Sequence, residues 1–263
     1  MLTFPFDTPI PDLTVARGKH GARQYPIDLD ASENKEEALD VRAKGILGEN
    51  YYHKEKENPP YNHRAPGSIP ELYVRKGILT RLEQVNELLR PLGYELFLFD
   101  AYRPIEVQNY FHDIWVPDFL RSRHPDWSEE HILEEVGNYW AKGAPSAGEV
   151  DLFSPPGHAT GGVVDCTLVH SETHEPLFMG SDFDEVASIS FPDHFEREGA
   201  SRALTPREAE ARTNRRILYH AMTHAGFVVN TREWWHFSYG DQAWAMRLGA
   251  PHAVYSLLTI SHD

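Results

Sequence analysis

The sequence HATGGVVD, residues 158–165, decides the fold of this chain when it is read together with EWWH, residues 233–236. Each stretch places potential metal ligands beside an apolar or aromatic run that is typical of a strand. His158, Asp165 and His236 offer two imidazole nitrogens and one carboxylate. Three nitrogen and oxygen ligands leave a fourth coordination position for water, which is typical of a catalytic zinc site, whereas structural sites close with four ligands, often sulfur.

Glu233 is the spare carboxylate of this set. A water in the open coordination position needs a neighbouring base that takes its proton as it attacks a carbonyl, which indicates hydrolase chemistry. On an ideal strand Glu233 and His236 would point to opposite faces, because their separation is odd. We therefore predict that Glu233 lies on a turn or bulge before a strand over residues 234–239, and the short polar segment 230–232 favours the turn.

The glycine pair before the first strand decides whether His158 can reach Asp165. In a strand that begins near Val163, Val163 and Asp165 share one face. Gly161 and Gly162 let the backbone bend, so that His158 can return beside Asp165. The alternative interpretation is a capped turn with a buried, hydrogen-bonded aspartate.

Five further histidines are rival ligands. Two of them, His220 and His224, have the helical i, i+4 spacing of a zincin site, but Ala221 instead of glutamate follows the first. We interpret the whole set as ordinary surface or interhelical residues: His170, His174, His194, His220 and His224.

Arg103 is expected at a corner between a strand and a helix. Apolar residues recur at helical spacing over residues 73–92, and the run 94–99 predicts a buried strand that ends at Asp100. Pro104 biases Arg103 toward an extended or turn conformation. On sequence alone the structural interpretation, a pair with Asp100 or another acid, is preferred, and Arg103 becomes functional only through its neighbours.

Further helices are expected around these strands. Ser128 is a candidate N-cap residue, and Thr205, followed by Pro206 and Glu208, has the combination that is typical of a helix start. The expected helices cover residues 105–115, 128–142 and 205–225, and a short strand is expected over residues 227–229.

The composition is that of a folded, acidic protein. Of 263 residues, 41% are apolar, which is enough for a substantial core. The 25 basic and 40 acidic residues give a formal net charge of −15, which argues against nucleic-acid and anionic-membrane partners. One cysteine excludes an internal disulfide, and residues 1–7 lack the features of a signal peptide, so a cytoplasmic enzyme is predicted.

Residues 1–66 are interpreted as an N-terminal arm. Their many prolines and charges predict an irregular, mostly extended segment with short helices at most. Tyr51, Tyr52 and Tyr61 indicate that the arm packs against the body of the protein. It either covers one side of a substrate cleft or simply wraps the surface.

Three motifs together resemble one family: residues 158–165, residues 233–236 and DAYRP, residues 100–104, are similar to the D-alanyl-D-alanine dipeptidases, the VanX-like branch of the zinc D,D-peptidases. The resemblance runs from about residue 72 to residue 237. It implies an α+β fold of the hedgehog and D,D-peptidase group, with a central, mostly antiparallel sheet flanked by helices. We expect a single domain over residues 1–263, with the arm packed on it.

The resemblance also implies a role for each site residue. His158, Asp165 and His236 match the ligands of one Zn²⁺ per chain. Glu233 matches the catalytic base, and Arg103 matches the arginine that stabilises the developing oxyanion. The implied reaction is hydrolysis of the D-alanyl-D-alanine dipeptide to free D-alanine, and the implied partner is this small substrate.

Two substrate contacts are expected from the same resemblance. Asp184 matches an acid near the site of the dipeptide's amino group, although without the resemblance it could equally cap backbone amides. The family often has a serine one or two places before the first ligand, where this chain has Pro156 and Gly157. Ser154 is the candidate for the missing hydroxyl contact.

Three alternative functions keep the same metal core. A D,D-carboxypeptidase or endopeptidase would act on peptidoglycan peptides and would need export and an open groove. A non-catalytic, hedgehog-like zinc-binding interaction protein would have lost the base or the arginine, and both are present here. A dipeptidase for L-peptides is separable only by assay.

Overall fold

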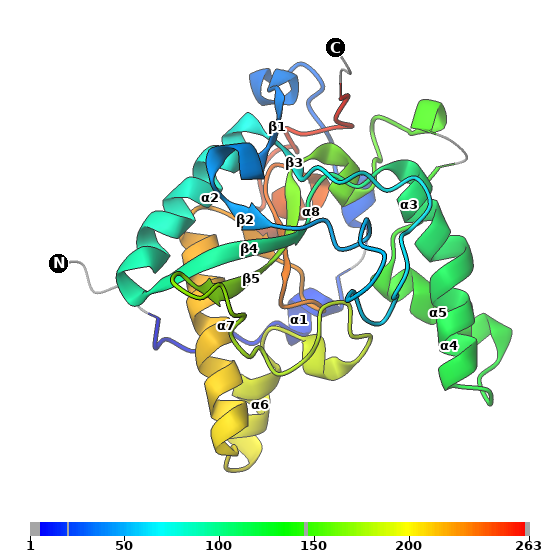
Figure 1. Ribbon diagram of the computed structural model, residues 1–263. Helices are drawn as coiled ribbons and strands as arrows, with labels where there is room; N and C mark the ends of the chain where they lie inside the picture. The colour runs from blue at the N-terminus through cyan, green and yellow to red at the C-terminus, as the bar shows by residue number, and fades with distance from the viewer. Residues whose placement is uncertain (1–5, 20, 145–146, 261–263) are drawn as a thin grey trace.

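The computed structural model describes residues 6–19, 21–144 and 147–260 and has the expected α+β fold (Figure 1). Residues 1–5 lie outside the described residues. They belong to the predicted arm and to residues 1–7, which lack the features of a signal peptide. The strands are β1 (Ala38–Asp40), β2 (Leu47–Gly48), β3 (Tyr73–Arg75), β4 (Tyr94–Asp100), β5 (Val163–His170), β6 (Val228–Val229) and β7 (His236–Ser238). The α-helices are α1 (Thr14–Arg17), α2 (Lys76–Leu89), α3 (Ile105–Tyr110), α4 (Val116–Arg123), α5 (Glu129–Tyr139), α6 (His194–Ser201), α7 (Pro206–His224) and α8 (Gln242–Leu248).

A five-stranded sheet in the order β2-β4-β5-β7-β6 forms the centre of the protein. Its β2–β4 pair is parallel and its other pairs are antiparallel, as a mostly antiparallel sheet requires. The register places Asp100 of β4 opposite Asp165 of β5, and Asp165 opposite His236 of β7. Side chains directly opposite on neighbouring strands lie about 5 Å apart, so these three polar residues form one row across the sheet.

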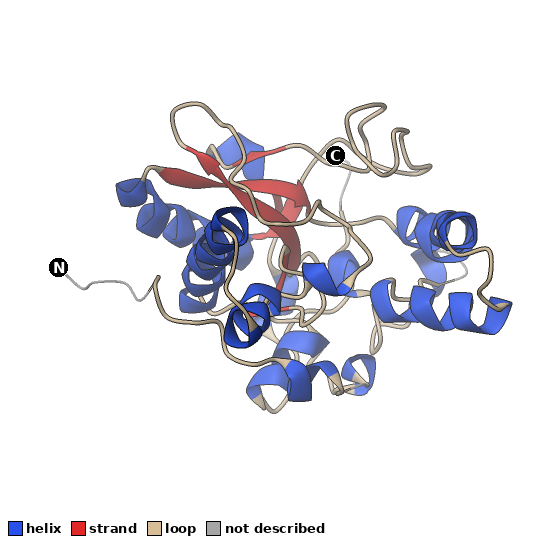
Figure 2. Cartoon of the chain, turned by 90° about the horizontal axis from the view of Figure 1, so that it is seen from below, coloured by secondary structure: helices blue, strands red, loops and turns tan. Residues whose placement is uncertain are grey.

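The helices cover the sheet and form a second group at its side. Helix α2 packs against β4 through Ile78, Leu82 and Val85, and α7 lies along α2. Helices α3, α4 and α5 stand together away from the sheet (Figures 1 and 2). The predicted caps are confirmed, because Ser128 accepts from the backbone of α5 and Thr205 forms a capping box with α7.

Several predicted boundaries are wrong. Residues 73–75 form strand β3 instead of a helical turn, because they pair with β1. The helix expected over residues 105–115 continues through a π-helical turn, Phe111–Trp115, into α4. The helix from Ser128 ends at Tyr139, and the strand expected over 234–239 is limited to β7.

The arm contributes strands that its composition did not predict. Strand β2 extends the central sheet, and β1 pairs with β3. A Cβ at Gly48 would lie 2.8 Å from the carbonyl oxygen of Leu98, so this edge strand approaches β4 more closely than other residues allow. Tyr52 and Tyr61 pack against Phe111 of the π turn. The division into one domain and an arm stays a prediction.

Cys166 lies directly after Asp165 in β5 but points to the opposite face of the strand. The thiol is fully buried, and burial raises its pKa well above the usual range. It therefore takes no part in the row of polar residues. Among the helices in the described part of the chain, none has the length and apolar character needed to cross a membrane.

Candidate metal centre

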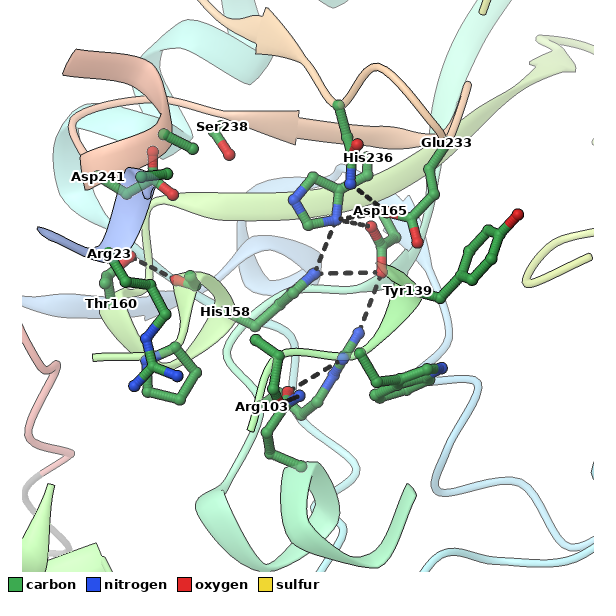
Figure 3. Close-up of a pocket in the computed structure, with 18 of the residues that line it drawn as sticks. Arg23, Arg103, Tyr139, His158, Thr160, Asp165, Glu233, His236, Ser238 and Asp241 are labelled. Atoms are coloured by element: carbon green, nitrogen blue, oxygen red, sulfur yellow. Dashed lines mark hydrogen bonds and ion pairs between the residues drawn. The ribbon is translucent and has the colours of Figure 1, made fainter. Parts of the chain in front are cut away.

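His158, Asp165 and His236 converge on one point above the sheet (Figure 3). His158 Nε2 lies 3.3 Å from His236 Nδ1 and 3.3 Å from Asp165 Oδ2, and His236 Nδ1 lies 3.2 Å from Asp165 Oδ1. Among the described residues this is the only group of three such side chains whose ligand atoms all lie within 4.8 Å of one another. The predicted ligand set is thus brought together from two strands and one loop.

The loop before β5 positions His158 as the sequence predicted. A short 3-10 turn, Gly157–Thr160, carries the imidazole, and Gly161 reverses the chain at φ 69°. His158 Nδ1 lies 2.8 Å from the carbonyl oxygen of Ala101. Since a carbonyl only accepts, Nδ1 donates to it, and Nε2 is the ring nitrogen that faces the centre. Such an outer contact fixes the orientation of a metal-bound imidazole.

The geometry and charge of the three side chains fit a divalent cation. Asp165 Oδ1 is buried and accepts no well-aligned hydrogen bond. Burial works to raise the pKa of Asp165, but His158 and His236 hold it far below its usual range. Burial likewise works to lower the pKa of His236, yet Asp165 and Glu233 raise it to about 9. The site therefore favours positive charge, and two nitrogens with one carboxylate oxygen are a donor set that suits zinc.

Glu233 lies on the turn before β7, as predicted. Its Oε2 is 3.4 Å from His236 Nδ1 and accepts a 2.6 Å hydrogen bond from Asn230. Asn230 also shapes the turn, because its side chain accepts from the backbone of Arg232. Burial raises the pKa of Glu233 to about 7, and the charge of Asp165 adds to this effect. A carboxyl with such a pKa can gain and lose a proton near neutral pH.

Arg103 is buried beside the centre and held on several sides. Its Nε donates to Asp100 at 2.9 Å, and its Nη2 contacts Asp165 Oδ2 at 3.3 Å and the hydroxyl of Tyr52 at 3.1 Å. The guanidinium also stacks over the ring of Trp140 at 4.5 Å. The pair with Asp100 was predicted, and the contact with Asp165 connects Arg103 to the ligand set.

Asp184 faces the same cavity from a backbone position with φ 58°. Its Oδ2 accepts hydrogen bonds of 2.8 Å from Tyr52 and 2.7 Å from Tyr61. Burial raises the pKa of Asp184 to about 8, and Asp165 adds to the shift. The hydroxyl of Tyr52 thus bridges Asp184 and Arg103. The sequence suggested that these tyrosines pack, but it gave no sign that they meet an acid and an arginine.

The metal pocket is the cavity that surrounds these side chains, with a volume of about 260 Å³. It is lined by Arg103, Glu233 and Asp184 together with the ligands, and Arg23 of the arm lines it as well. Figure 3 shows Glu233 on one side of His158 and Arg23 on the other. Ser154 holds Arg23 through its backbone carbonyl. A substrate contact of the Ser154 hydroxyl stays a prediction.

The five rival histidines do not belong to the metal group found among the described residues. His220, for example, contacts the carbonyl oxygen of Thr8 through Nε2 at 2.8 Å. Sequence reasoning missed Asn230, Tyr52 and Tyr61 as parts of the site. Only for Asn230, in a short polar segment directly before Glu233, was there a local signal.

Comparison with known proteins agrees with the site. A family model described as D-Ala-D-Ala dipeptidase matches residues 71–254. A D-alanyl-D-alanine dipeptidase of Synechocystis is 34% identical over 68% of this chain and 74% of its own length. Those of Streptomyces coelicolor and Enterococcus faecalis are 32% and 30% identical, each over 64% of this chain and 73% of their own lengths.

Among solved structures, the vancomycin resistance D,D-pentapeptidase VanY in complex with Zn(II) matches with a TM-score of 0.39 and 15% identity, over 68% of this chain and 79% of that one. The family model covers well over half of the present chain and includes every residue of the metal group. This chain therefore belongs to the D-Ala-D-Ala dipeptidase family and is a metallopeptidase.

Proposed function

We propose that this enzyme hydrolyses the D-alanyl-D-alanine dipeptide to two molecules of D-alanine with one Zn²⁺ per chain. The observation that carries the proposal is the convergence of His158, Asp165 and His236 beside Glu233. Membership of the family supports the substrate, since the curated relatives are named D-alanyl-D-alanine dipeptidases. The proposal includes action on free dipeptide in the cytoplasm.

The three ligands would hold the metal and leave one position open. When bound there, zinc supplies Lewis-acid polarisation and makes water acidic enough to be deprotonated near neutral pH. Glu233 then takes the proton of the attacking water. The carboxyl can pass this proton to the leaving amine of the second D-alanine, which balances the reaction. Asn230 keeps Glu233 turned toward the centre.

Arg103 would stabilise the negative charge that develops on the carbonyl oxygen. Its guanidinium is buried and fixed by Asp100, Gln108 and Tyr52 before any substrate arrives. A donor held in place in this way needs no reorganisation during the reaction, which is the condition for strong electrostatic stabilisation. Arg103 lines the metal pocket, so the carbonyl oxygen has access to it.

Asp184 would bind the ammonium group of the dipeptide while Tyr52 and Tyr61 hold its carboxyl group. The bound cation would favour the charged carboxylate and so lower the pKa that burial raises. Ser154 is kept as a second substrate contact in this proposal. A metal pocket of about 260 Å³ is small for a ligand site, since most such cavities measure about 300–1,000 Å³. This size suits a small substrate such as a dipeptide.

The decisive experiment incubates the purified protein with D-Ala-D-Ala, L-Ala-L-Ala and a pentapeptide that ends in D-Ala-D-Ala, with and without a chelator. We expect release of D-alanine from the first substrate only, and loss of this activity on chelation. Preferred cleavage of the pentapeptide would assign the carboxypeptidase function instead. If the zinc-loaded protein hydrolysed none of the three substrates, the proposal would be wrong.

A further inference from the structure

We propose that a second cavity, next to the metal pocket, binds a small oxyanion such as a carboxylate or inorganic phosphate. This anion cavity has a volume of about 230 Å³ and lies between α1, the end of α5, the 228–232 turn and α8. Asn138, Asn230, His236 and Ser238 line both cavities. An anion held here would therefore lie beside one of the proposed metal ligands.

The charge of the anion cavity is opposite to that of the protein. Three arginines and one lysine line it: Arg17, Lys19, Arg232 and Arg247. No aspartate or glutamate is found among its described lining residues, although the chain has a net charge of −15. A cleft that is lined by one sign of charge and has walls of low polarity concentrates ions of the opposite sign.

Three of these four cations are left without a carboxylate. Arg17 is paired with buried Asp193 at 2.9 Å and is therefore neutralised. Within the described part of the chain, no ion pair is formed by Lys19, Arg232 or Arg247.

Nearby polar groups do not neutralise these unpaired cations. Arg232 interacts with the hydroxyl of Tyr139, which is uncharged at neutral pH. Glu135 lies near the end of α5, outside the lining, and accepts a hydrogen bond of 3.2 Å from Asn138. Burial lowers the pKa of Arg247, which means that its positive charge is only partly solvated. A bound anion would relieve this cost.

The residue types favour an oxyanion over other ligands. The planar guanidinium groups of Arg232 and Arg247 can donate paired hydrogen bonds to a carboxylate or a phosphate, and Lys19 adds a point charge. Two sources offer this chemistry: the carboxylate of the amino acid that the proposed reaction releases, and free inorganic phosphate. Binding of phosphate does not rest on the proposed reaction, because it can be measured without turnover.

Titration calorimetry of the zinc-loaded enzyme with inorganic phosphate, at constant ionic strength, tests the proposal. Arg247→Gln should weaken binding about tenfold, because a charge-assisted contact is lost. Lys19→Gln should weaken it about twofold to threefold, since Lys19 is exposed and its charge is screened. The control variants Arg90→Gln and Lys44→Gln each remove one positive charge of the same residue type outside the anion cavity. They should leave the Kd for phosphate unchanged.

Competition experiments then separate the two sources. D-alanine should displace phosphate, whereas D-alaninamide, which lacks the carboxylate, should not. If phosphate binds in the anion cavity and D-alanine fails to displace it, inorganic phosphate is the ligand. An unchanged Kd in both Arg247→Gln and Lys19→Gln, or no binding of phosphate at millimolar concentration, would overturn the proposal. Because Lys19 is exposed, its variant should fold even if Arg247→Gln does not.

Discussion

The two sides of the metal pocket are built in different ways. On one side, Asp100, Asp165 and His236 stand in one row across the central sheet, set by the strand register and by a register shift between Leu98 and Asp100. On the other side, Tyr52 and Tyr61 come from the irregular arm and reach Asp184 through contacts that span more than a hundred residues. The sheet thus carries residues of the proposed metal chemistry, whereas the arm holds Asp184, which lines the metal pocket.

The largest effect is expected on the sheet side, at Glu233. Glu233→Gln removes the proposed base and should lower kcat by about 10²- to 10⁴-fold, while the zinc content stays the same. Turnover and metal analysis of the same preparation measure both quantities. Glu95→Gln, at a carboxylate far along β4, is the control. A folded but metal-free Glu233→Gln protein would show that Glu233 is a ligand.

The second largest loss of kcat is expected for substitution of Arg103. Loss of a preorganised oxyanion donor typically costs about 3–4 kcal/mol of barrier, so Arg103→Ala should lower kcat by about 10²- to 10³-fold without loss of zinc. Arg103→Lys keeps the charge but loses the fork that contacts Asp100 and Tyr52, and it should restore only part of the rate. Near wild-type turnover in Arg103→Ala would disprove the assigned role.

A smaller effect is expected where the arm meets the site. Tyr52→Phe removes the hydroxyl between Arg103 and Asp184 but keeps the packed ring, so kcat/KM should fall about tenfold, the value of one hydrogen bond to a charged group. Steady-state kinetics and metal analysis test this. Tyr25→Phe is a matched control, because its hydroxyl contacts only the carbonyl of Ala250. If kcat/KM fell as far in Tyr52→Phe as in Arg103→Ala, the arm would contribute as much to catalysis as the sheet, and the proposed division between the two sides would be wrong.

The last prediction concerns stability, not turnover, and sharpens the same division. The folded pKa of Asp184 is about 8, against 3.8 as its usual value. Between these values the folded protein keeps a proton that the unfolded chain has lost, so stability falls as the pH rises through this window. Asp184→Asn has no such proton, so its stability relative to the wild type should increase as the pH rises, by up to about 1.4 kcal/mol per pH unit. Denaturant unfolding at pH 5, 6, 7 and 8 measures the difference, and parallel stability curves would contradict the shift.

The sheet side could be predicted from sequence because local rules control it. The glycine turn, the alternation of β5 and the odd spacing of Glu233 and His236 each constrain one position, and the structure follows all three. The resemblance to a family supplied the roles that spacing alone left open. The structure of the arm side could not be predicted, because strand β2 and the contacts of the tyrosine hydroxyls depend on partners far away in the sequence.

The buried position of Cys166 has a practical consequence. Its sulfur is sealed on the far face of the strand that carries Asp165, so an alkylating reagent should leave the intact enzyme unmarked. The reagent can reach this sulfur only when the core that packs on this face of β5 opens. Since this cysteine is the only one in the chain, the rate of its labelling would report how often the core around β5 opens.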